Sequence, residues 1–231
     1  MFKLIVVLFA VAALSFSAFA QTKNQGKELR DAVDRVDKAS DVMRAVMSVP
    51  EKSIPRDLLQ KAKAIVVFPG SIKAAFIVGG QGGKGVAIRR LDSGWSAPAF
   101  LNMGGGSVGL QIGGQKTDYV LLVMNEHGLE NLMADKFEIG GEGSVSGGPV
   151  GRTAAATTNA TMDAEILTYS RSKGLFAGVS LKGVVISQDQ DMNDAIYQKS
   201  ARQILIESPM AASAAPATLQ KFGKTVTNYV R

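Results

Sequence analysis

One segment carries the residue types of a hydrolase active site. Residues 105–109 match the Gly-x-Ser-x-Gly elbow that presents a nucleophilic serine, here Ser107, and the single histidine, His127, follows 20 residues later. An elbow needs a helix directly after its serine. The residues after Ser107 favour a strand, and the interval before His127 lacks the acid-bearing segments that usually intervene. We therefore expect no enzyme activity, and a serine hydrolase that uses Ser107 and His127 is the enzyme alternative.

Two glycine patterns match the dinucleotide fingerprint Gly-x-Gly-x-x-Gly, at residues 80–85 and 104–109. That fingerprint needs a strand before the glycines and a helix after them, whose N-terminus holds the pyrophosphate. In this chain the following residues, 86–88 and 110–112, favour strands. We expect sheet bends and hairpin turns here, and no nucleotide cofactor.

Carboxylates cluster at Asp189, Asp191 and Asp194. They loosely resemble a calcium loop, but the glycine of its sharp turn and its terminal bidentate acid are missing. Acidic residues in the first turn of a helix interact favourably with the helix dipole, which is the simpler interpretation. One histidine and no cysteine leave no zinc site. We expect no metal and no cofactor.

The basic residues offer a different chemistry, because several fall in predicted turns. A cluster of them would hold phosphate head groups, since each cation near an anionic surface contributes about 1 kcal/mol. The alternative is an ordinary solvated basic surface. Aromatic residues are few and do not alternate with the cations, which argues against nucleic acid as a partner. The cations in question are Lys73, Lys84, Arg89, Arg90, Arg152, Arg171 and Lys173.

The N-terminus has the layout of a secretory signal. Lys3 precedes an apolar run from Leu4 to Leu14, and Ala18-Phe19-Ala20 is a small-residue cleavage site. Cleavage after Ala20 leaves 25 basic and 20 acidic residues, a formal charge of +5. The absence of cysteine excludes disulfides, a cysteine nucleophile and a lipid-modified N-terminal cysteine. We expect residues 1–20 to be removed and the protein to be periplasmic or secreted, and a retained N-terminal anchor is the alternative.

Helices are predicted at both ends of the remaining chain. Apolar residues at spacings of three, four and seven predict an amphipathic helix from Lys27 to Val49, which either packs across a sheet or lies on a membrane. Ser53-Ile54-Pro55 opens a short helix that ends near Ala62. Asn125 caps a third, beside which His127 is exposed or part of the cap. The closing helices run from Asp191 to Ser200 and from Thr218 to Val230, with a hinge at 211–217.

Between these helices, short β-branched or aromatic runs separated by glycines predict antiparallel strands. A hairpin turn is expected at Gly79 to Gly83. Residues 161–169 are ambiguous. The 25 glycines fall partly within strands, where a bent backbone or a close approach must compensate for their cost. The predicted strands are 65–68, 75–78, 86–88, 108–112, 119–124, 137–145 and 175–186.

These elements define the expected architecture. It is an α+β protein with one domain over residues 21–231, in which a glycine-rich, strongly curved antiparallel β-sheet or barrel is flanked by N-terminal and C-terminal helices. About 210 residues suffice for one substantial core. The domain core spans about residues 30–200, and a C-terminal helix covers 216–230.

Several segments together resemble the SYLF domain family, in order and with plausible spacing over residues 30–200. The most distinctive is residues 169–181, Tyr-Ser-Arg-Ser-Lys-Gly-Leu-Phe-Ala-Gly-Val-Ser-Leu. The other matching segments are residues 54–65, 67–69, 82–86, 95–100, 105–113 and 148–152.

The resemblance implies a lipid-binding module without enzymatic activity. SYLF domains bind membrane lipids, phosphoinositides in eukaryotic members, and the yeast actin-patch proteins bind actin. Carried over, Lys84, Arg152, Arg171 and Lys173 become the expected head-group contacts. The secretory signal indicates an exported bacterial version, for which anionic phospholipids such as phosphatidylglycerol or cardiolipin are the expected partners. A structural module of the cell envelope that binds another protein is the alternative.

Overall fold

The computed structural model describes residues 26–49, 53–140, 145–151 and 163–230, with the backbone alone at 73–79 and 107–114. The helix at 26–47 is called the N-terminal helix below. The other α-helices are α2 (Arg56–Lys61), α3 (Glu126–Leu132), α5 (Gln190–Tyr197) and α6 (Lys221–Val230). The strands are β1 (Ala64–Leu91), β2 (Gly94–Trp95), β3 (Ala99–Val123), β4 (Phe137–Ile139), β5 (Val145–Gly147), β6 (Ile166–Ser172), β7 (Leu175–Gly178) and β8 (Val184–Gln188).

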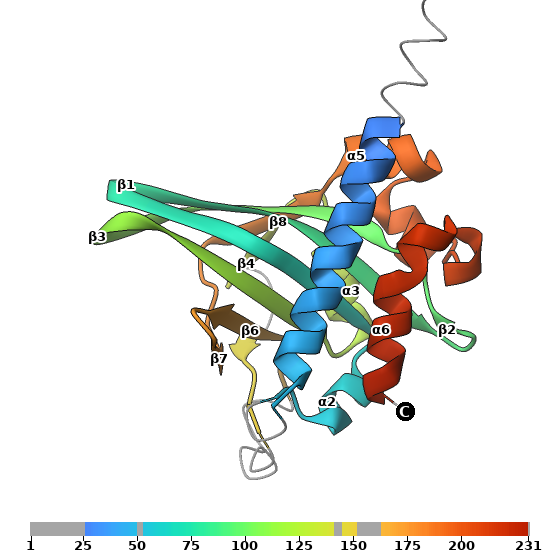
Figure 1. The fold of residues 1–231 in the computed structure, drawn as a ribbon, viewed down its shortest axis with the longest axis horizontal. Coiled ribbons are helices and arrows are strands. Elements are labelled where there is room, and N and C mark those ends of the chain that lie inside the picture. The colour runs from blue at the N-terminus through green and yellow to red at the C-terminus, as the bar shows by residue number, and fades with distance from the viewer. Residues whose placement is uncertain (1–25, 50–52, 141–144, 152–162, 231) are drawn as a thin grey trace, which may run out of the picture.

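The N-terminal helix confirms the amphipathic pattern and packs on the sheet. Its apolar stripe, including Val36, Ala39, Met43 and Val46, is buried in the core. Figure 1 shows the helix crossing one face of the sheet, with α6 beside it. Burial of this stripe supplies the stability that a lone helix lacks in water. The helix therefore belongs to the fold and does not need a membrane to cover its apolar face.

The strands at the centre of the sheet are much longer than predicted. β1 and β3 pair antiparallel almost throughout, from Ala64 opposite Val123 to Ala87 opposite Ala99. The predicted hairpin turn at Gly79 to Gly83 was wrong, because these glycines continue β1 and pair with residues 103–107. A primed hairpin turn needs residues with positive φ. Among the described glycines such values occur elsewhere, for example at Gly94 and Gly174.

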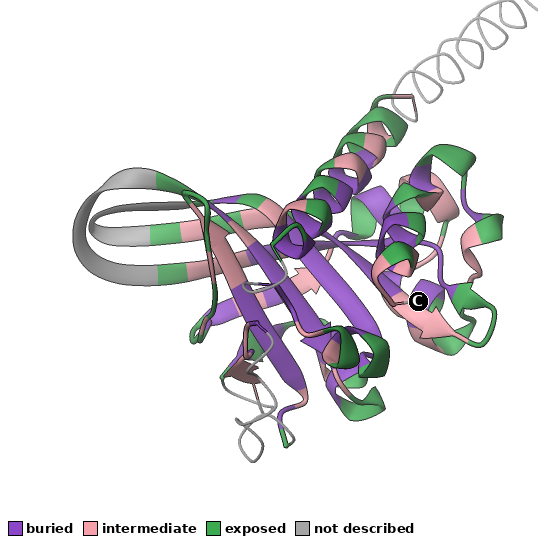
Figure 2. Ribbon diagram, turned by 60° about the horizontal axis from the view of Figure 1, so that its bottom comes forward, coloured by how far each residue is buried: buried purple, intermediate pink, exposed green. Residues whose placement is uncertain are grey.

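β1 folds back on itself and nearly closes a barrel. The backbone N–H of Arg90 donates to the carbonyl of Lys63 at 2.7 Å, which joins the two ends of the strand. Further along, a Cβ on Gly85 would lie 2.4 Å from the ring of Phe68, so the ring occupies the space above that glycine. Figure 2 shows the buried centre of this curved sheet. The expected curved, glycine-dependent sheet with flanking helices is confirmed.

The strands after β3 extend the β1–β3 pair from the β3 side. β6 pairs with the second half of β3 and β8 with its first half. β4 pairs with β8, while β5 runs parallel to β6 and β7 antiparallel to it. The ambiguous segment 161–169 contains the start of β6 at Ile166. The predicted 137–145 and 175–186 strands are each interrupted, so that β4 and β5 are separate, as are β7 and β8.

Local signals placed the shorter helices well. Pro55 directly precedes α2, and the side chain of Asn125 accepts the N–H of Gly128 at 2.7 Å to cap α3. The predicted 211–217 hinge contains one 3₁₀ turn, η4 (Ala212–Ala214), and a second, η5 (Ala217–Gln220), begins at its last residue and leads into α6. A π-helical turn, η3 (Gln203–Glu207), was not predicted. Pro50, the predicted end of the N-terminal helix, lies outside the described residues.

The carboxylate cluster at the start of α5 has a structural role that the sequence did not reveal. The carboxylate of Asp189 lies 2.7 Å from the guanidinium of Arg35 on the N-terminal helix, and the two side chains are only 12% and 6% exposed. Arg35 also lies over the ring of Phe100, 5.6 Å from its centroid. Asn193 hydrogen-bonds both backbone groups of Phe100. The cluster thus joins α5, β3 and the N-terminal helix.

Two buried tyrosines give the fold a testable dependence on high pH. Burial raises the pKa of Tyr169 and of Tyr197 above the ordinary value of 10.0, and Asp57 adds to the rise for Tyr169. The unfolded chain therefore ionises near pH 10 while the folded chain holds these protons. We expect the free energy of unfolding to be unaffected by these groups below about pH 9 and to fall above about pH 10, by up to about 1.4 kcal/mol per pH unit per tyrosine.

Urea denaturation across this range measures the effect. The Tyr169→Phe variant is the control, because it removes one titrating group and keeps the ring that stacks on Phe176 with centroids 5.4 Å apart. Its stability should fall less steeply above about pH 10 than that of the unmodified protein. Equal slopes for the two proteins would show that Tyr169 does not titrate as its burial requires.

Candidate functional site

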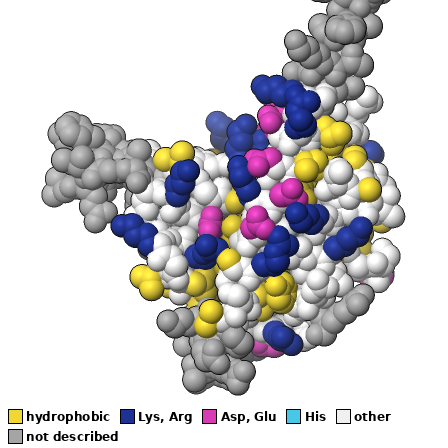
Figure 3. Space-filling view, in the orientation of Figure 1, with side chains coloured by type: hydrophobic (Ala, Val, Ile, Leu, Met, Phe, Trp, Pro, Cys, Tyr) yellow, Lys and Arg dark blue, Asp and Glu magenta, His cyan; other side chains and the backbone are white. Residues whose placement is uncertain are grey.

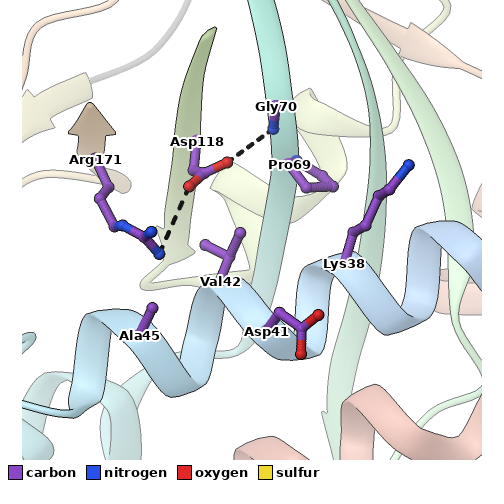
Figure 4. A pocket seen from close by; sticks show the side chains of 8 residues that line it. All are labelled: Lys38, Asp41, Val42, Ala45, Pro69, Gly70, Asp118 and Arg171. Atoms are coloured by element: carbon purple, nitrogen blue, oxygen red, sulfur yellow. Dashed lines mark hydrogen bonds and ion pairs between the residues drawn. The ribbon is translucent and has the colours of Figure 1, made fainter. Parts of the chain in front are cut away.

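An open groove lies where the N-terminal helix crosses the outer side of the sheet (Figure 4). Its volume is about 370 Å³. On the sheet side of the groove, Arg171 from β6 lies directly opposite Asp118 on the neighbouring strand β3, with a guanidinium nitrogen 3.8 Å from a carboxylate oxygen. The other oxygen of Asp118 accepts the N–H of Gly70 at 2.8 Å. The groove is lined by Lys38, Asp41, Val42, Ala45, Pro69, Gly70, Asp118 and Arg171.

The charges of this groove largely compensate one another. On the helix side, Lys38 pairs with Asp34 at 2.6 Å and Arg44 pairs with Asp41. Figure 3 shows acidic and basic side chains interleaved along this face of the molecule. Arg171 is the exception, since its contact with Asp118 is long for a charge-assisted hydrogen bond. Its guanidinium, one-third exposed, therefore keeps donors available to a second anion.

Beyond the groove, three strands bring together a group of residues that we call the sheet rim. Ile72 on β1 lies opposite Lys116 on β3. The carbonyl of Lys116 accepts the hydroxyl of Ser172 on β6, and Ser172 also accepts the amide of Gln115 at 2.6 Å. The next turn adds Lys173 and Leu175. The sheet rim comprises Ile72, Lys116, Arg171, Lys173 and Leu175.

The sheet rim combines cations with exposed apolar side chains. Ile72 is 53% exposed and Leu175 is 74% exposed. Lys116 and Lys173 are exposed, and neither has an ion-pair partner among the described residues. Asp118 is the acid beside Arg171. The register places Ile72, Lys116 and Arg171 on one face of the sheet and Leu175, opposite Ser172, on the other. The sheet rim therefore presents positive charge and exposed apolar side chains around one end of these strands, which is the combination that peripheral membrane contacts use.

The turn that carries Lys173 is a two-residue hairpin. Ser172 pairs with Leu175, and the intervening Lys173 and Gly174 have φ of 49° and 78°. Positive φ at both central positions is the geometry of a type I′ turn, which favours Asn or Gly. A lysine at the first position is conformationally unfavourable. The turn nevertheless places a lysine at the tip of the hairpin.

The other two predicted site residues are placed differently. Lys84 on β1 is exposed, and it lies between Gly83 and Gly85, where an added Cβ would point at Ser71 and Phe68. Side chains alternate along a strand, so Lys84 lies on the outer side of the barrel. No contact among the described residues joins Lys84 to Arg171 or Lys173. Arg152 lies outside the described residues.

Sequence reasoning missed Lys116 and Ile72. Both belong to long strands that the glycines seemed to interrupt, so their relation to β6 was hidden. On β3, Asp118 pairs with Arg171 of β6, and Lys116, two residues earlier, pairs with Ile72 of β1. These two pairings bring Ile72 and Lys116 close to Arg171. A correct continuous reading of β3 would have placed Lys116 and Asp118 on one face, because residues i and i+2 share a face.

The features that resemble enzyme sites have other surroundings in the structure. Ser107 lies within β3 opposite Gly79, and the strand continues to Val123, so the strand-to-helix elbow is absent there. The side chain of His127 is 68% exposed, as predicted, and its Nδ1 lies 2.6 Å from the carboxylate of Glu165. The described part of the chain contains no group of three or more potential metal ligands. It also contains no helix long and apolar enough to span a bilayer.

The family of the chain follows from a comparison with known proteins. A model of the Ysc84 family, described as Las17-binding protein actin regulator, matches residues 104–229, more than half of the chain. The chain belongs to the Ysc84 family. The match runs from the glycines of β3 to the end of α6, and so includes β6, the Lys173 turn and the closing helices. The SYLF resemblance seen in the sequence is thereby confirmed.

Curated members of the Ysc84 family are similar over most of this chain. The SH3 domain-containing protein PJ696.02 of Schizosaccharomyces pombe is 35% identical over 208 residues, which cover 86% of this chain and 46% of that protein. Protein YSC84 of Saccharomyces cerevisiae is 34% identical over 193 residues, 82% of this chain and 39% of that protein.

A human protein is similar to this chain to a comparable degree. The SH3 domain-containing YSC84-like protein 1 of Homo sapiens is 32% identical over 172 residues, which cover 71% of this chain and 50% of that protein. The chain thus matches half or less of each of these three relatives' length. The similarity therefore establishes the shared Ysc84 domain and leaves the activities of the whole relatives to be tested separately.

Proposed function

We propose that this protein is a non-catalytic lipid-binding module that contacts anionic phospholipid head groups through its basic residues. The contacts are Lys84, Arg171 and Lys173, with Arg152 from outside the described residues. Lys116 joins them. The observation that carries the proposal is the sheet rim, where Lys116, Arg171 and Lys173 from two strands and a turn lie beside two exposed apolar side chains.

The distribution of charges favours the sheet rim over the N-terminal helix as the lipid-binding surface. Each unpaired cation near an anionic bilayer contributes about 1 kcal/mol, so four cations give roughly 4 kcal/mol before any apolar contribution. That corresponds to millimolar affinity, and burial of apolar surface strengthens it further. The outer face of the N-terminal helix is less suited, because Asp34, Asp37 and Asp41 each pair with a cation. Lys38 and Arg44 on this helix are thereby already paired with acids.

The proposal includes export. Residues 1–20 act as a cleaved secretory signal, and the mature protein begins at Gln21 in the periplasm or outside the cell. The ligands there are the anionic phospholipids of a bacterial envelope, phosphatidylglycerol or cardiolipin. N-terminal sequencing of the protein recovered from the periplasm and from the medium of a bacterial host tests cleavage, and an intact Met1 in every fraction would contradict it.

Vesicle co-sedimentation tests lipid binding directly. The mature protein, residues 21–231, is mixed with vesicles of phosphatidylcholine or of phosphatidylcholine with phosphatidylglycerol across a salt series. We expect binding to the anionic vesicles alone, weakening as salt rises, because the contacts are screened charges. The Ser107→Ala variant should bind equally well. Failure to bind anionic vesicles at low salt would refute the proposal.

The Lys173 turn allows stability and binding to be separated. Asn tolerates positive φ better than lysine, so Lys173→Asn is expected to raise the free energy of unfolding by about 0.5–1 kcal/mol. The same change removes one cation and should weaken binding to anionic vesicles roughly fivefold. Urea denaturation and sedimentation measure the two effects on one variant. A variant that is more stable and binds as tightly would exclude Lys173 from the contact.

A protein-binding function is the second candidate, favoured by the family description. Other members of the Ysc84 family are described as Las17-binding actin regulators, and one relative is named LAS seventeen-binding protein 3. For an exported version, the corresponding role is an envelope module that binds a protein partner. Cross-linking in intact cells from a residue of the sheet rim distinguishes the two, since lipid binding alone yields no specific protein adduct.

A further inference from the structure

We infer that the sheet rim inserts Ile72 and Leu175 into the bilayer, so that the far end of the paired β1–β3 strands faces the membrane and α6 faces away. This inference rests on the proposed lipid binding. It adds how the protein contacts the bilayer, namely by shallow insertion of apolar side chains from a β-sheet. The occupant of this surface is an anionic phospholipid bilayer.

Exposure of apolar surface is the first argument. Ile72 and Leu175 are two of the four large apolar side chains that are exposed among the described residues. The other two, Leu29 and Val49, lie near opposite ends of the N-terminal helix or just beyond it, 20 residues apart in sequence. Ile72 and Leu175, by contrast, are 103 positions apart in the chain, and the sheet brings them within three strand spacings, roughly 15 Å, on its two faces near the same end of the strands.

Charge complementarity identifies the occupant. Lys116 lies directly opposite Ile72, and Lys173 is two residues before Leu175 in the hairpin turn. Each exposed apolar side chain therefore has nearby an ammonium group without an ion-pair partner in the part of the chain that the structure describes. An ordinary protein partner with an apolar surface would not need cations at both positions, whereas an anionic bilayer does.

The shape of the sheet and the sequence beyond Ile72 fit the same orientation. Figure 1 shows the β1 and β3 ribbons extending away from α2 and α6, toward the side opposite β2. The backbone of both strands stays paired beyond Ile72, from Lys73 opposite Gln115 to Val78 opposite Val108. The sequence of these segments is mostly apolar or glycine, as in Ala74-Ala75-Phe76-Ile77-Val78. Apolar composition thus continues toward the end that would meet the bilayer.

The absence of cysteine from the chain makes a site-specific test simple. Single cysteines are introduced as Ile72→Cys and Leu175→Cys and labelled with an environment-sensitive fluorophore. Ser93→Cys is the matched control, because Ser93 is exposed in the turn before β2, on the opposite side of the molecule. Vesicles contain phosphatidylglycerol and lipids with a quencher in the acyl chain. Circular dichroism confirms that each labelled variant is folded.

We expect a blue shift and acyl-chain quenching for the labels at 72 and 175 on addition of vesicles, and neither change at 93. The unlabelled double variant Ile72→Ser, Leu175→Ser should bind at least about tenfold more weakly, because two apolar side chains no longer leave water. Its dependence on salt should be unchanged, since the cations remain.

The outcomes separate this inference from the proposed function. Salt-sensitive sedimentation without a spectral change at 72 and 175 would overturn insertion and leave head-group contact standing. Equal changes at 72, 175 and 93 would overturn the orientation. If the unmodified protein failed to sediment with anionic vesicles, both lipid binding and insertion would be refuted.

Discussion

Replacing Asp189 by alanine is expected to lower the free energy of unfolding by about 3–5 kcal/mol. The change removes the partner of Arg35, whose side chain is 6% exposed and lies 2.7 Å from the Asp189 carboxylate. A guanidinium left alone in the core loses its compensating charge and cannot regain water. Because Arg35 also contacts Phe100, the damage extends to the packing of the N-terminal helix on β3. Urea denaturation monitored by circular dichroism measures the loss.

Two comparison variants give this expectation its controls. Asp34→Ala breaks the exposed pair with Lys38, whose side chains are about 60% exposed, and should cost less than about 1 kcal/mol. The double variant Arg35→Met, Asp189→Leu removes both buried charges and should recover most of the stability, since apolar replacements of a buried pair are often neutral. A loss below about 1 kcal/mol for Asp189→Ala would show that Arg35 is solvated in solution.

The second large effect is expected at Gly85, where alanine should cost about 3 kcal/mol or more. A Cβ there would lie 2.4 Å from the Phe68 ring, which is fully buried inside the folded-back β1. The ring is 0% exposed and cannot move away into solvent, so relief requires the surrounding core to shift. Chemical denaturation of the Gly85→Ala protein measures the cost against the unmodified chain.

Gly104→Ala is the matched control, because it lies in the neighbouring strand β3 and an added Cβ meets nothing within 4 Å. That change should shift stability by less than about 1 kcal/mol. The double variant Gly85→Ala, Phe68→Leu should recover part of the loss by making room for the methyl group. If Gly85→Ala and Gly104→Ala were equally stable, the contact between Gly85 and Phe68 would not hold the barrel closed.

Features set by neighbouring residues were predictable from the sequence. The spacing of Val36, Met43 and Met47 predicted the N-terminal helix, Pro55 the start of α2, and Asn125 the cap of α3. Each signal acts within about one helical turn, so no knowledge of the tertiary structure was needed. The strong curvature of the sheet also followed, because glycine within strands requires a compensating bend or close approach.

Features set by distant residues were not predictable. Glycines 79–83 were predicted to form a turn, yet they continue β1 because residues 103–107 supply their pairing partners. Likewise, Asp189 was assigned to the helix dipole, since its partner Arg35 lies 154 residues earlier. Local composition is the same for a glycine-rich strand and a glycine-rich turn. The partner strand decides between them.

The candidate site contains features of both kinds, some predictable from the sequence and some not. The cations Arg171 and Lys173 were identified from their place near a turn, and that turn exists between β6 and β7. The apolar half of the surface was missed, because Ile72 is exposed only through the path of β1 relative to β3 and β6. Whether Lys84 shares a ligand with Arg171 depends on the closure of the barrel, which no local pattern encodes.

The most direct test of anionic lipid binding is a comparison of two double charge reversals in vesicle sedimentation. Lys116→Glu with Lys173→Glu alters the sheet rim, and Lys61→Glu with Lys224→Glu makes the same change in net charge on α2 and α6, where both lysines are exposed. We expect the first protein to bind anionic vesicles roughly 30-fold more weakly or worse, and the second to bind nearly as the unmodified protein does. Equal losses in the two would mean that only net charge matters and would contradict a lipid contact at the sheet rim.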